Sequence, residues 1–228
     1  MQRILVFTKT TGFRHESIEA GVAALRALAV ESGWELDHSE DGAAFTEQNL
    51  AQYAATVWLD ASGDVLDAGQ RSALAVYLRG GGGFAGIHSA SDAEWNWPEF
   101  EHIVGARFLS HPNEELQFQE ARLDVTDASH PSTRELPDPW LWTDEWYVFT
   151  SNPSERVEVL LEVDESTYDT DGVPMGPRHP ISWHSTFGAG RTWYTALGHR
   201  PETFADAHFR AHLAGGIASV LRGVVTSR

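Results

Sequence analysis

Cysteine is absent from this 228-residue chain, and its absence excludes disulfide bonds, thiolate metal ligands and cysteine nucleophiles. Positive charge is also scarce, because 16 Lys and Arg residues face 33 Asp and Glu residues, for a formal net charge of −17. Such an excess of negative charge repels both a phosphate backbone and an anionic lipid surface. We therefore expect no nucleic-acid partner and no membrane partner.

Long apolar runs are missing too, since no stretch approaches the roughly 18 residues that a membrane-spanning helix needs. The first residues enter an apolar segment at Ile4 without the apolar region and cleavage site of a signal peptide. These absences predict a cytoplasmic protein. Its length suits one domain spanning residues 1–228, and the acidic composition leaves a homodimer open without indicating one.

In the first hundred residues, short apolar segments alternate with segments of helical period. We expect strands at residues 4–8, 34–38, 56–59 and 84–87. A helix carrying Ile18, Leu25 and Leu28 on one face follows the first strand. A second helix starts at Asp67, where Gln70 completes a capping box. This alternation predicts an α/β fold with a mostly parallel sheet and helices on both faces.

The pattern changes after about residue 111, where we expect antiparallel additions to the sheet and long loops. Strands are predicted at residues 116–125, 157–163, 181–184 and 192–197, with a Pro- and Trp-rich loop at 131–146. The turn at 187–191 has the glycines of a hairpin connection. A final amphipathic helix presents Phe209, Leu213, Ile217 and Val220 on one face.

The run of four glycines from Gly80 to Gly83 leads through a short apolar segment to His88. Small residues follow this histidine, Ser89 and then Ala90, as a sharp strand-to-helix turn requires. Nucleophile elbows use such a turn to raise one side chain above the end of a sheet, and here that side chain is an imidazole. Because a turn with no other role would take Gly or Asn, we expect His88 to be functional.

Ligands of open α/β sheets bind outside the carboxyl ends of the strands, so the residues that follow each expected strand are site candidates. Those residues are His15, Asp60, His88, Asp92, His184 and His199. Four histidines at such positions form the strongest signal in the sequence. Some have a structural alternative, since His15 could satisfy free amides at a helix start and Asp92 could cap the turn after His88.

Two carboxylates lie among aromatic residues in the segment from Asp144 to Tyr147. Apolar surroundings raise the pKa of a carboxyl group, which suits Glu145 for acid–base catalysis, and such a carboxylate could equally orient a neighbouring histidine. Tryptophan is abundant, with nine residues, and Trp95 follows the His88 turn closely enough to line a sugar pocket. His111 precedes a proline in a loop, where it could bind substrate or only hold the turn.

A divalent metal such as zinc would accept imidazole nitrogen and carboxylate oxygen as ligands. The candidates are His15, His88, His184 and His199. No His-x-x-x-His spacing occurs among them, so a metal site would depend on their convergence in the fold. A metal-free acid–base site uses the same residues, and the sequence leaves both alternatives open.

Several motifs, in order along nearly the whole chain, resemble those of the ThuA-like family. They are Gly12–Ile18, Gly83–Asp92, Gly105–Phe108 with His111-Pro112, His130-Pro131, Asp144–Tyr147, Pro180–His184 and Gly188–Arg191 leading to Ala196–His199. The family is associated with the utilisation of trehalose and related disaccharides. Its fold is similar to that of class I glutamine amidotransferases, so the resemblance implies a flavodoxin-like sheet.

In amidotransferases of that fold the elbow carries the catalytic cysteine, and His88 stands at the matching position. The resemblance therefore implies that glutamine hydrolysis through a thioester does not operate here. The segment His199-Arg200-Pro201-Glu202 is similar to the histidine–proline–glutamate end of the amidotransferase triad, with one residue inserted. That insertion leaves open whether Glu202 joins the site.

These observations lead us to expect an enzyme that acts on a trehalose-type or keto-disaccharide by hydrolysis, elimination or isomerisation. The expected catalytic residues are His88 at the centre with His15, Glu145, His184 and His199 around it, and the expected substrate contacts are Asp60, Asp92, Trp95, His111 and Tyr147. A non-catalytic sugar-binding or regulatory protein is the alternative. The expected partner in either case is a small sugar.

Overall fold

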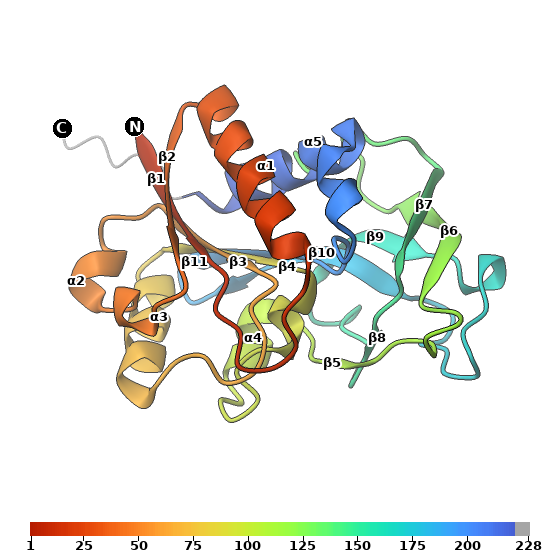
Figure 1. The fold of residues 1–228 in the computed structure, drawn as a ribbon, viewed down its shortest axis with the longest axis horizontal. Helices are drawn as coiled ribbons and strands as arrows, with labels where there is room; N and C mark the ends of the chain where they lie inside the picture. Colours follow the sequence, from red (N-terminus) through yellow and green to blue (C-terminus); the bar gives the residue numbers. More distant parts are fainter. Residues whose placement is uncertain (222–228) are drawn as a thin grey trace.

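The structure is a computed structural model that describes residues 1–221, and its centre is a nine-stranded sheet (Figure 1). The parallel half comprises β1 (Gln2–Phe7), β2 (Trp34–Ser39), β3 (Ala55–Leu59), β4 (Gly83–Ile87) and β11 (Gly190–Thr195). The antiparallel half comprises β6 (Phe118–Val125), β7 (Trp140–Glu145), β9 (Glu158–Val163) and β10 (Pro180–Phe187). The strand order β2-β1-β3-β4-β11-β10-β9-β6-β7 makes the two halves meet at the β10–β11 hairpin.

The parallel half matches the strands expected from the sequence to within one or two residues at each end. The central strands β3 and β4 are buried at every position, as strands covered on both faces are. β2 lies at the edge of the sheet and is mostly half-buried, in agreement with its alternating sequence. These strands all point the same way, so their carboxyl ends share one edge of the sheet.

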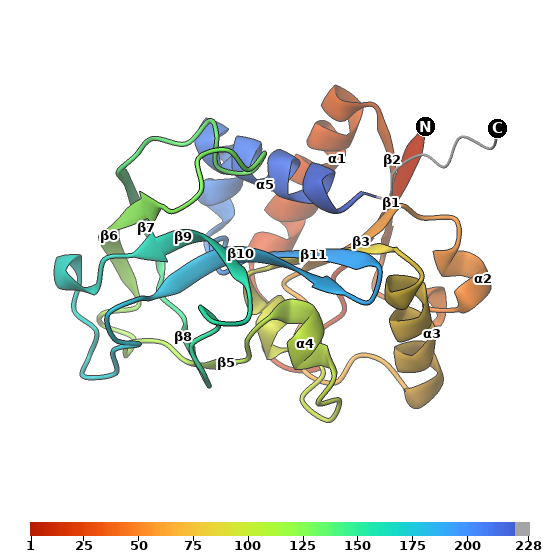
Figure 2. The ribbon, with the colours of Figure 1, turned by 180° about the vertical axis from the view of Figure 1, so that it is seen from behind.

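Helices cover both faces of the parallel half (Figure 1 and, from behind, Figure 2). One face carries α1 (Ser17–Ser32) and α5 (Ala207–Val220), and the other carries α3 (Ala68–Arg79) and α4 (Phe100–Val104). The predicted apolar face of α5 is buried, with Phe209, Leu213, Ile217 and Val220 at most 1% exposed. The shorter helical elements are α2 (Glu47–Leu50), η1 (Gly42–Ala44), η2 (His88–Asp92), η3 (Glu165–Thr167) and η4 (Pro201–Ala205).

Two local signals in the sequence set the helix ends where they were expected. α3 begins at the predicted capping box, in which Asp67 Oδ1 accepts from the Gln70 amide at 2.9 Å and Gln70 Oε1 accepts from the Asp67 amide at 3.0 Å. α1 ends at Gly33, whose φ of 71° is left-handed and costs glycine little. The predicted capping box is confirmed.

The antiparallel half differs from the expected pattern in two places. Residues 131–146, expected to be a loop, end in β7, which pairs with β6 in a register that sets Ala121 opposite Trp142. Pro137 and Pro139 precede this strand rather than interrupt it, so they do not remove a donor from the ladder. β10 is also longer than the expected 181–184, which places His184 inside the strand and not at its end.

A small second sheet pairs β5 (Phe108–Ser110) with β8 (Val148–Phe149) beside the antiparallel half. Within residues 1–221, no helix combines the length and the hydropathy that crossing a bilayer would need. The expected fold class is confirmed: α/β with a mostly parallel sheet, helices on both faces, and antiparallel additions in the C-terminal half.

Candidate functional site

The turn after β4 has the geometry of an elbow. His88 is the first residue of η2 and has a φ of 50°, in the left-handed region that costs a side-chain-bearing residue conformational energy. Its imidazole Nδ1 lies 2.7 Å from the carbonyl oxygen of Ala196, which follows β11. The strained turn and this bond together hold the ring above the carboxyl ends of β4 and β11, as the sequence led us to expect.

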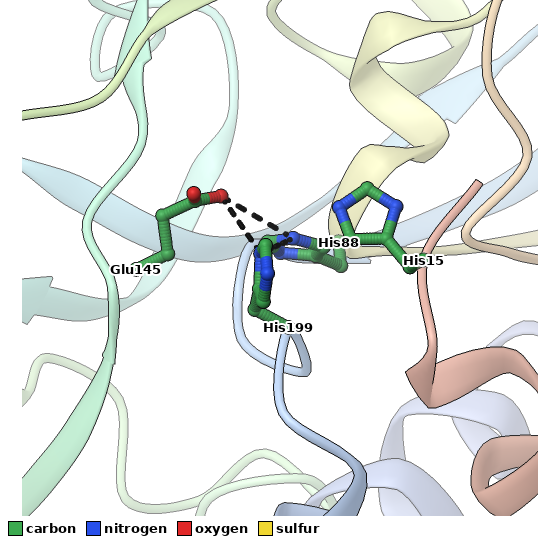
Figure 3. A group of neighbouring side chains, drawn as sticks. All are labelled: His15, His88, Glu145 and His199. Atoms are coloured by element: carbon green, nitrogen blue, oxygen red, sulfur yellow. Dashed lines mark hydrogen bonds and ion pairs between the residues drawn. The ribbon is translucent and has the colours of Figure 1, made fainter. Parts of the chain in front are cut away.

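Four of the predicted residues converge at this edge of the sheet, and we call them the histidine–carboxylate cluster. Its members are His15, His88, Glu145 and His199, each with one potential ligand atom within 4.8 Å of the others (Figure 3). His199 Nδ1 lies 3.1 Å from His88 Nε2 and 3.0 Å from Glu145 Oε2. The ring of His15 lies 4.7 Å from each of the other two imidazoles, centroid to centroid.

The members of the cluster come from both halves of the fold. His15 precedes α1, His88 follows β4 and His199 follows β11, so the parallel half supplies all three imidazoles at one edge. Glu145 is the last residue of β7 in the antiparallel half. In Figure 3 its carboxylate faces His88 and His199 from one side, while His15 lies on the other side.

Asp144 ties the two halves together beneath the cluster. This buried carboxylate accepts four hydrogen bonds, from Trp142 Nε1 at 3.0 Å and from the amides of Glu145, Gly198 and His199 at 3.0, 2.9 and 3.2 Å. Burial raises the pKa of Asp144, and the donated hydrogen bonds oppose that rise. Because the bonds join β7 to the segment after β11, Asp144 sets the position of Glu145 relative to His199.

The hydrogen bonds of His88 determine where its proton lies. The Ala196 carbonyl can only accept, so Nδ1 of His88 carries the hydrogen and Nε2 presents a lone pair. That lone pair faces the hydroxyl of Tyr147 at 2.9 Å and Nδ1 of His199. Tyr147 also stacks on the His88 ring, with 4.4 Å between centroids.

The cluster combines charged and neutral groups. Burial lowers the pKa of His88 to about 4, and burial together with the neighbouring imidazoles lowers the pKa of His15 to about 2. Burial alone would raise the pKa of Glu145, but the hydrogen bond from His199 and the nearby imidazoles lower it to about 2. The pKa of His199 is raised, because its bond to the Glu145 carboxylate outweighs its own burial. An ionised carboxylate therefore adjoins a readily protonated imidazole.

A cavity of about 470 Å³ opens beside the cluster. The predicted residues that line it are His15, Asp92, His111, Glu145, Tyr147 and His199. Five further residues line it, Phe13, Ser89, Phe108, Glu114 and Gln117, and none was predicted as a site residue. Gln117 contacts the cluster through a 2.6 Å bond from Nε2 to Glu145 Oε1, and the ring of Phe13 lies 4.8 Å from that of His15, centroid to centroid. Phe13 and Phe108 lie in the motifs Gly12–Ile18 and Gly105–Phe108, whereas Gln117 belongs to no motif that would have singled it out.

His88 itself is fully buried and does not line the cavity. Its ring lies behind His199 and Tyr147, which both contact its Nε2 and both border the cavity. A ligand in the cavity would therefore meet His199 and Glu145 first, with His88 acting through them.

His184 does not join the cluster, and the expectation that it would is wrong. β10 runs antiparallel to β11, so its carboxyl end points away from the edge at which the parallel strands end. His184 lies within β10 opposite Trp193 and stacks on His130, with 4.9 Å between ring centroids. The histidines that reach this site follow strands that point in the same direction as β4, and β10 points the other way.

Two predicted substrate contacts also lie outside the cavity lining. Trp95 is 46% exposed, donates from Nε1 to Asp92 at 2.8 Å and has the Arg107 guanidinium over its ring. Asp60 is fully buried and accepts from Ser17 Oγ at 2.9 Å, and burial raises its pKa to about 7. Trp95 thus packs beside the cavity, and Asp60 lies in the interior at the end of β3.

Glu202, whose place was left open, lies on the surface. Its side chain is 59% exposed and pairs with Arg200. The carboxylate beside His199 is Glu145, from β7. The carboxylate that contacts His199 therefore comes from β7 and not from the segment with the inserted residue.

Comparison with known proteins adds three findings. The family model described as ThuA, trehalose utilisation, matches residues 3–219. Two solved structures described as ThuA-like align with this chain. The one from Bacteroides uniformis is 25% identical with a TM-score of 0.78, and the alignment covers 94% of this chain and 89% of that chain. The one from Parabacteroides merdae is 21% identical with a TM-score of 0.75, and the alignment covers 100% of this chain and 92% of that chain. No curated protein matches the chain.

A more distant structural match is a β-galactosidase from Bacillus circulans sp. alkalophilus. It is 13% identical with a TM-score of 0.61, and the alignment covers 97% of this chain but only 32% of that chain. At this identity the match shows a shared fold alone, in one part of a larger enzyme.

Proposed function

Because this chain belongs to the ThuA family, described by trehalose utilisation, we propose that it is a carbohydrate-utilisation enzyme acting on a trehalose-type or keto-disaccharide. One observation carries the proposal: His88, His199 and Glu145 are linked at 3.1 and 3.0 Å beside a cavity of about 470 Å³. That volume lies in the usual range of small-molecule sites, about 300–1,000 Å³. The proposal includes one domain over residues 1–228, a cytoplasmic location and a small sugar as the partner.

The proton states of the cluster suit acid–base chemistry. Hydrolysis, elimination and isomerisation of a sugar each need one group that takes a proton and one that gives a proton. In the metal-free cluster, the raised pKa of His199 makes it the proton donor, and the ionised carboxylate of Glu145 is the acceptor. His88 and Tyr147 hold His199 and Glu145 in place from behind, so we assign them positioning roles.

The cavity lining suits a sugar ring. Phe13 and Phe108 offer apolar surface to the C–H faces of the ring, while Asp92, His111 and Gln117 offer polar atoms to its hydroxyl groups. Asp92 already accepts a hydrogen bond from Trp95, which fixes the carboxylate at the cavity wall.

The first test is product analysis with trehalose and with 3-keto-disaccharides. Glu145→Gln and His199→Gln should each lower kcat/KM by at least about 100-fold, the contribution expected of one acid or base. His208→Ala, on the exposed surface of α5, is the matched control and should keep wild-type activity. Unchanged turnover in both cluster variants would overturn the assignment of the site.

A non-catalytic sugar-binding protein is the second candidate, favoured by the fact that an imidazole stands at the elbow in place of a nucleophilic thiol. Titration calorimetry separates the two candidates. Saturable binding of these sugars without any product would reject the enzyme and support the binding protein. Product formation would reject a purely binding role.

A further inference from the structure

We propose that His88, His199 and Glu145 form a three-ligand site for a divalent transition-metal ion of the zinc class, with His15 beside the open coordination position. The inference deepens the proposed function and rests on it for the identity of the substrate alone. The metal site itself is argued from the geometry and the hydrogen bonds of the cluster.

The three ligand atoms form a triangle of the right size. His88 Nε2 to His199 Nδ1 is 3.1 Å, His199 Nδ1 to Glu145 Oε2 is 3.0 Å, and His88 Nε2 to Glu145 Oε2 is 3.5 Å. A tetrahedral ion with bonds of about 2.0–2.1 Å sets its ligands about 3.3–3.4 Å apart. An ion could therefore bind all three atoms with side-chain shifts of only a few tenths of an ångström.

Hydrogen bonds outside the triangle direct the free electron pairs toward its centre. His88 donates from Nδ1 to the Ala196 carbonyl, the arrangement that usually orients a metal-bound imidazole. Glu145 uses Oε1 to accept from Gln117 at 2.6 Å, which leaves Oε2 for the centre. Asp144 holds the backbone amides of Glu145 and His199. The side chains of His88 and Glu145 thus each have an outer partner that fixes their orientation, and Asp144 fixes the backbone of His199.

The three contacts inside the triangle have too few hydrogens to form a hydrogen bond along each of them. His199 Nδ1 can carry one hydrogen, yet it faces two acceptors, Glu145 Oε2 and the lone pair of His88 Nε2, of which the latter can also accept from the Tyr147 hydroxyl outside the triangle. One hydrogen cannot lie along both contacts. A cation at the centre interacts favourably with all three atoms at once, since each then donates an electron pair.

The donor set and the cavity indicate a catalytic type of metal site. Two imidazoles and one carboxylate with an open fourth position are the ligands of one class of catalytic zinc centre. His15, His199 and Glu145 line the cavity, so the open position would face the substrate. An ion there would polarise a carbonyl or hydroxyl oxygen of the sugar as a Lewis acid.

The test is direct metal binding. The full chain, freed of metal with a chelator, is titrated with ZnCl₂ by calorimetry and with CoCl₂ by visible absorption, where few-coordinate cobalt has intense bands. We expect one equivalent to bind to the wild type. Glu145→Gln and His199→Gln should each weaken binding by at least about tenfold, while His184→Ala, which removes the surface histidine pair, should bind as the wild type does.

Several outcomes would overturn the metal site. These are no saturable binding to the wild type, binding that both cluster variants retain, or binding that His184→Ala removes. Circular dichroism reports whether each variant folds. The test does not depend on the variants, because the titration of the wild type alone can reject the site.

The two proposals fail separately. Metal binding without turnover of any sugar rejects the proposed function and leaves the metal site standing. Turnover by chelator-treated protein that binds neither ion rejects the metal site and leaves the proposed function standing.

Discussion

Histidine rings pack together at two places among residues 1–221, and comparing one pair from each place shows why only one place is a candidate site. His88 and His199 lie 5.0 Å apart between ring centroids, at the edge where the parallel strands end. His130 and His184 are as close, at 4.9 Å, on the antiparallel half. The first pair has a carboxylate at 3.0 Å and an adjoining cavity. Closeness of imidazoles is therefore a weak indicator of function, and their partners decide it.

The partners differ because the strands differ in direction. Parallel strands deliver the residues that follow them to one edge, where side chains from distant segments share a cavity. β10 runs the other way, so His184 lies within the sheet, away from the edge at which the parallel strands end. His130 Nδ1, in turn, is bonded to Ser132 Oγ at 2.8 Å in its own loop. The second pair also borders a cavity, of about 350 Å³, which His184 and Glu158 line, but within residues 1–221 no carboxylate is bonded to either of its rings.

The largest effect that would sharpen this comparison is expected at Asp144. In Asp144→Asn an amide NH₂ would replace one oxygen and face backbone N–H donors, which leaves them unsatisfied. We expect kcat/KM to fall by about 10–100-fold, as for other residues that orient a site from behind, with most of the loss in kcat.

Steady-state kinetics with the active sugar measures that loss, and circular dichroism verifies the fold. Glu158→Gln is the matched control, because Glu158 is an exposed carboxylate opposite His184 in the register of β9 and β10. Wild-type kinetics in Asp144→Asn would show that the cluster does not depend on the link between the two halves.

The parallel half of the fold was predictable because its signals are local. Apolar segments, the capping box at Asp67 and the glycines before β4 each act over a few residues. The sharp turn at His88 was also foreseen, from its small neighbours, and the structure adds that its φ of 50° is left-handed. Three of the four strand-exit histidines converge because each follows a strand of the parallel half, and these strands end at the same edge.

The antiparallel half was harder to predict because pairing between distant segments determines it. Glu145 stood out as a carboxylate among aromatics, yet nothing local to β7 shows that the strand lies last in the sheet and that its end returns to His199. The direction of β10 likewise depends on its pairing with β11. The error at His184 follows from that direction, which a single apolar segment does not reveal.

A smaller effect is expected at His212, a buried histidine outside the cluster, where a substitution should change stability and not catalysis. His212 is fully buried on α5, with Nδ1 at 2.8 Å from the Ser132 carbonyl and Nε2 at 3.1 Å from Thr195 Oγ1. Burial lowers its pKa from 6.5 to about 4. The folded state therefore favours the neutral ring, and this contribution is complete above pH 6.5 and is lost as the pH falls toward 4.

Replacing His212 by Gln should make the acid dependence of stability shallower. The loss of one titrating group removes at most about 1.4 kcal/mol per pH unit from the slope of the unfolding free energy. The variant should also be less stable at neutral pH by about 1–3 kcal/mol, because a buried partner is left unsatisfied. Urea unfolding at pH 7, 5.5 and 4.5 measures both, and parallel curves for variant and wild type would contradict the expected titration.

The smallest effect is expected at His184, and this variant tests whether the pair of His130 and His184 has no part in the reaction. In His184→Ala the stacking contact with His130 is lost at a half-buried position, and such surface changes usually alter stability by less than about 1 kcal/mol. Neither kcat nor KM should change by more than about twofold, since no contact links this ring to the cluster. A large loss of activity with an intact fold would mean that the antiparallel half contributes more to the reaction than Glu145 alone, because β10 is the strand that joins it to the parallel half.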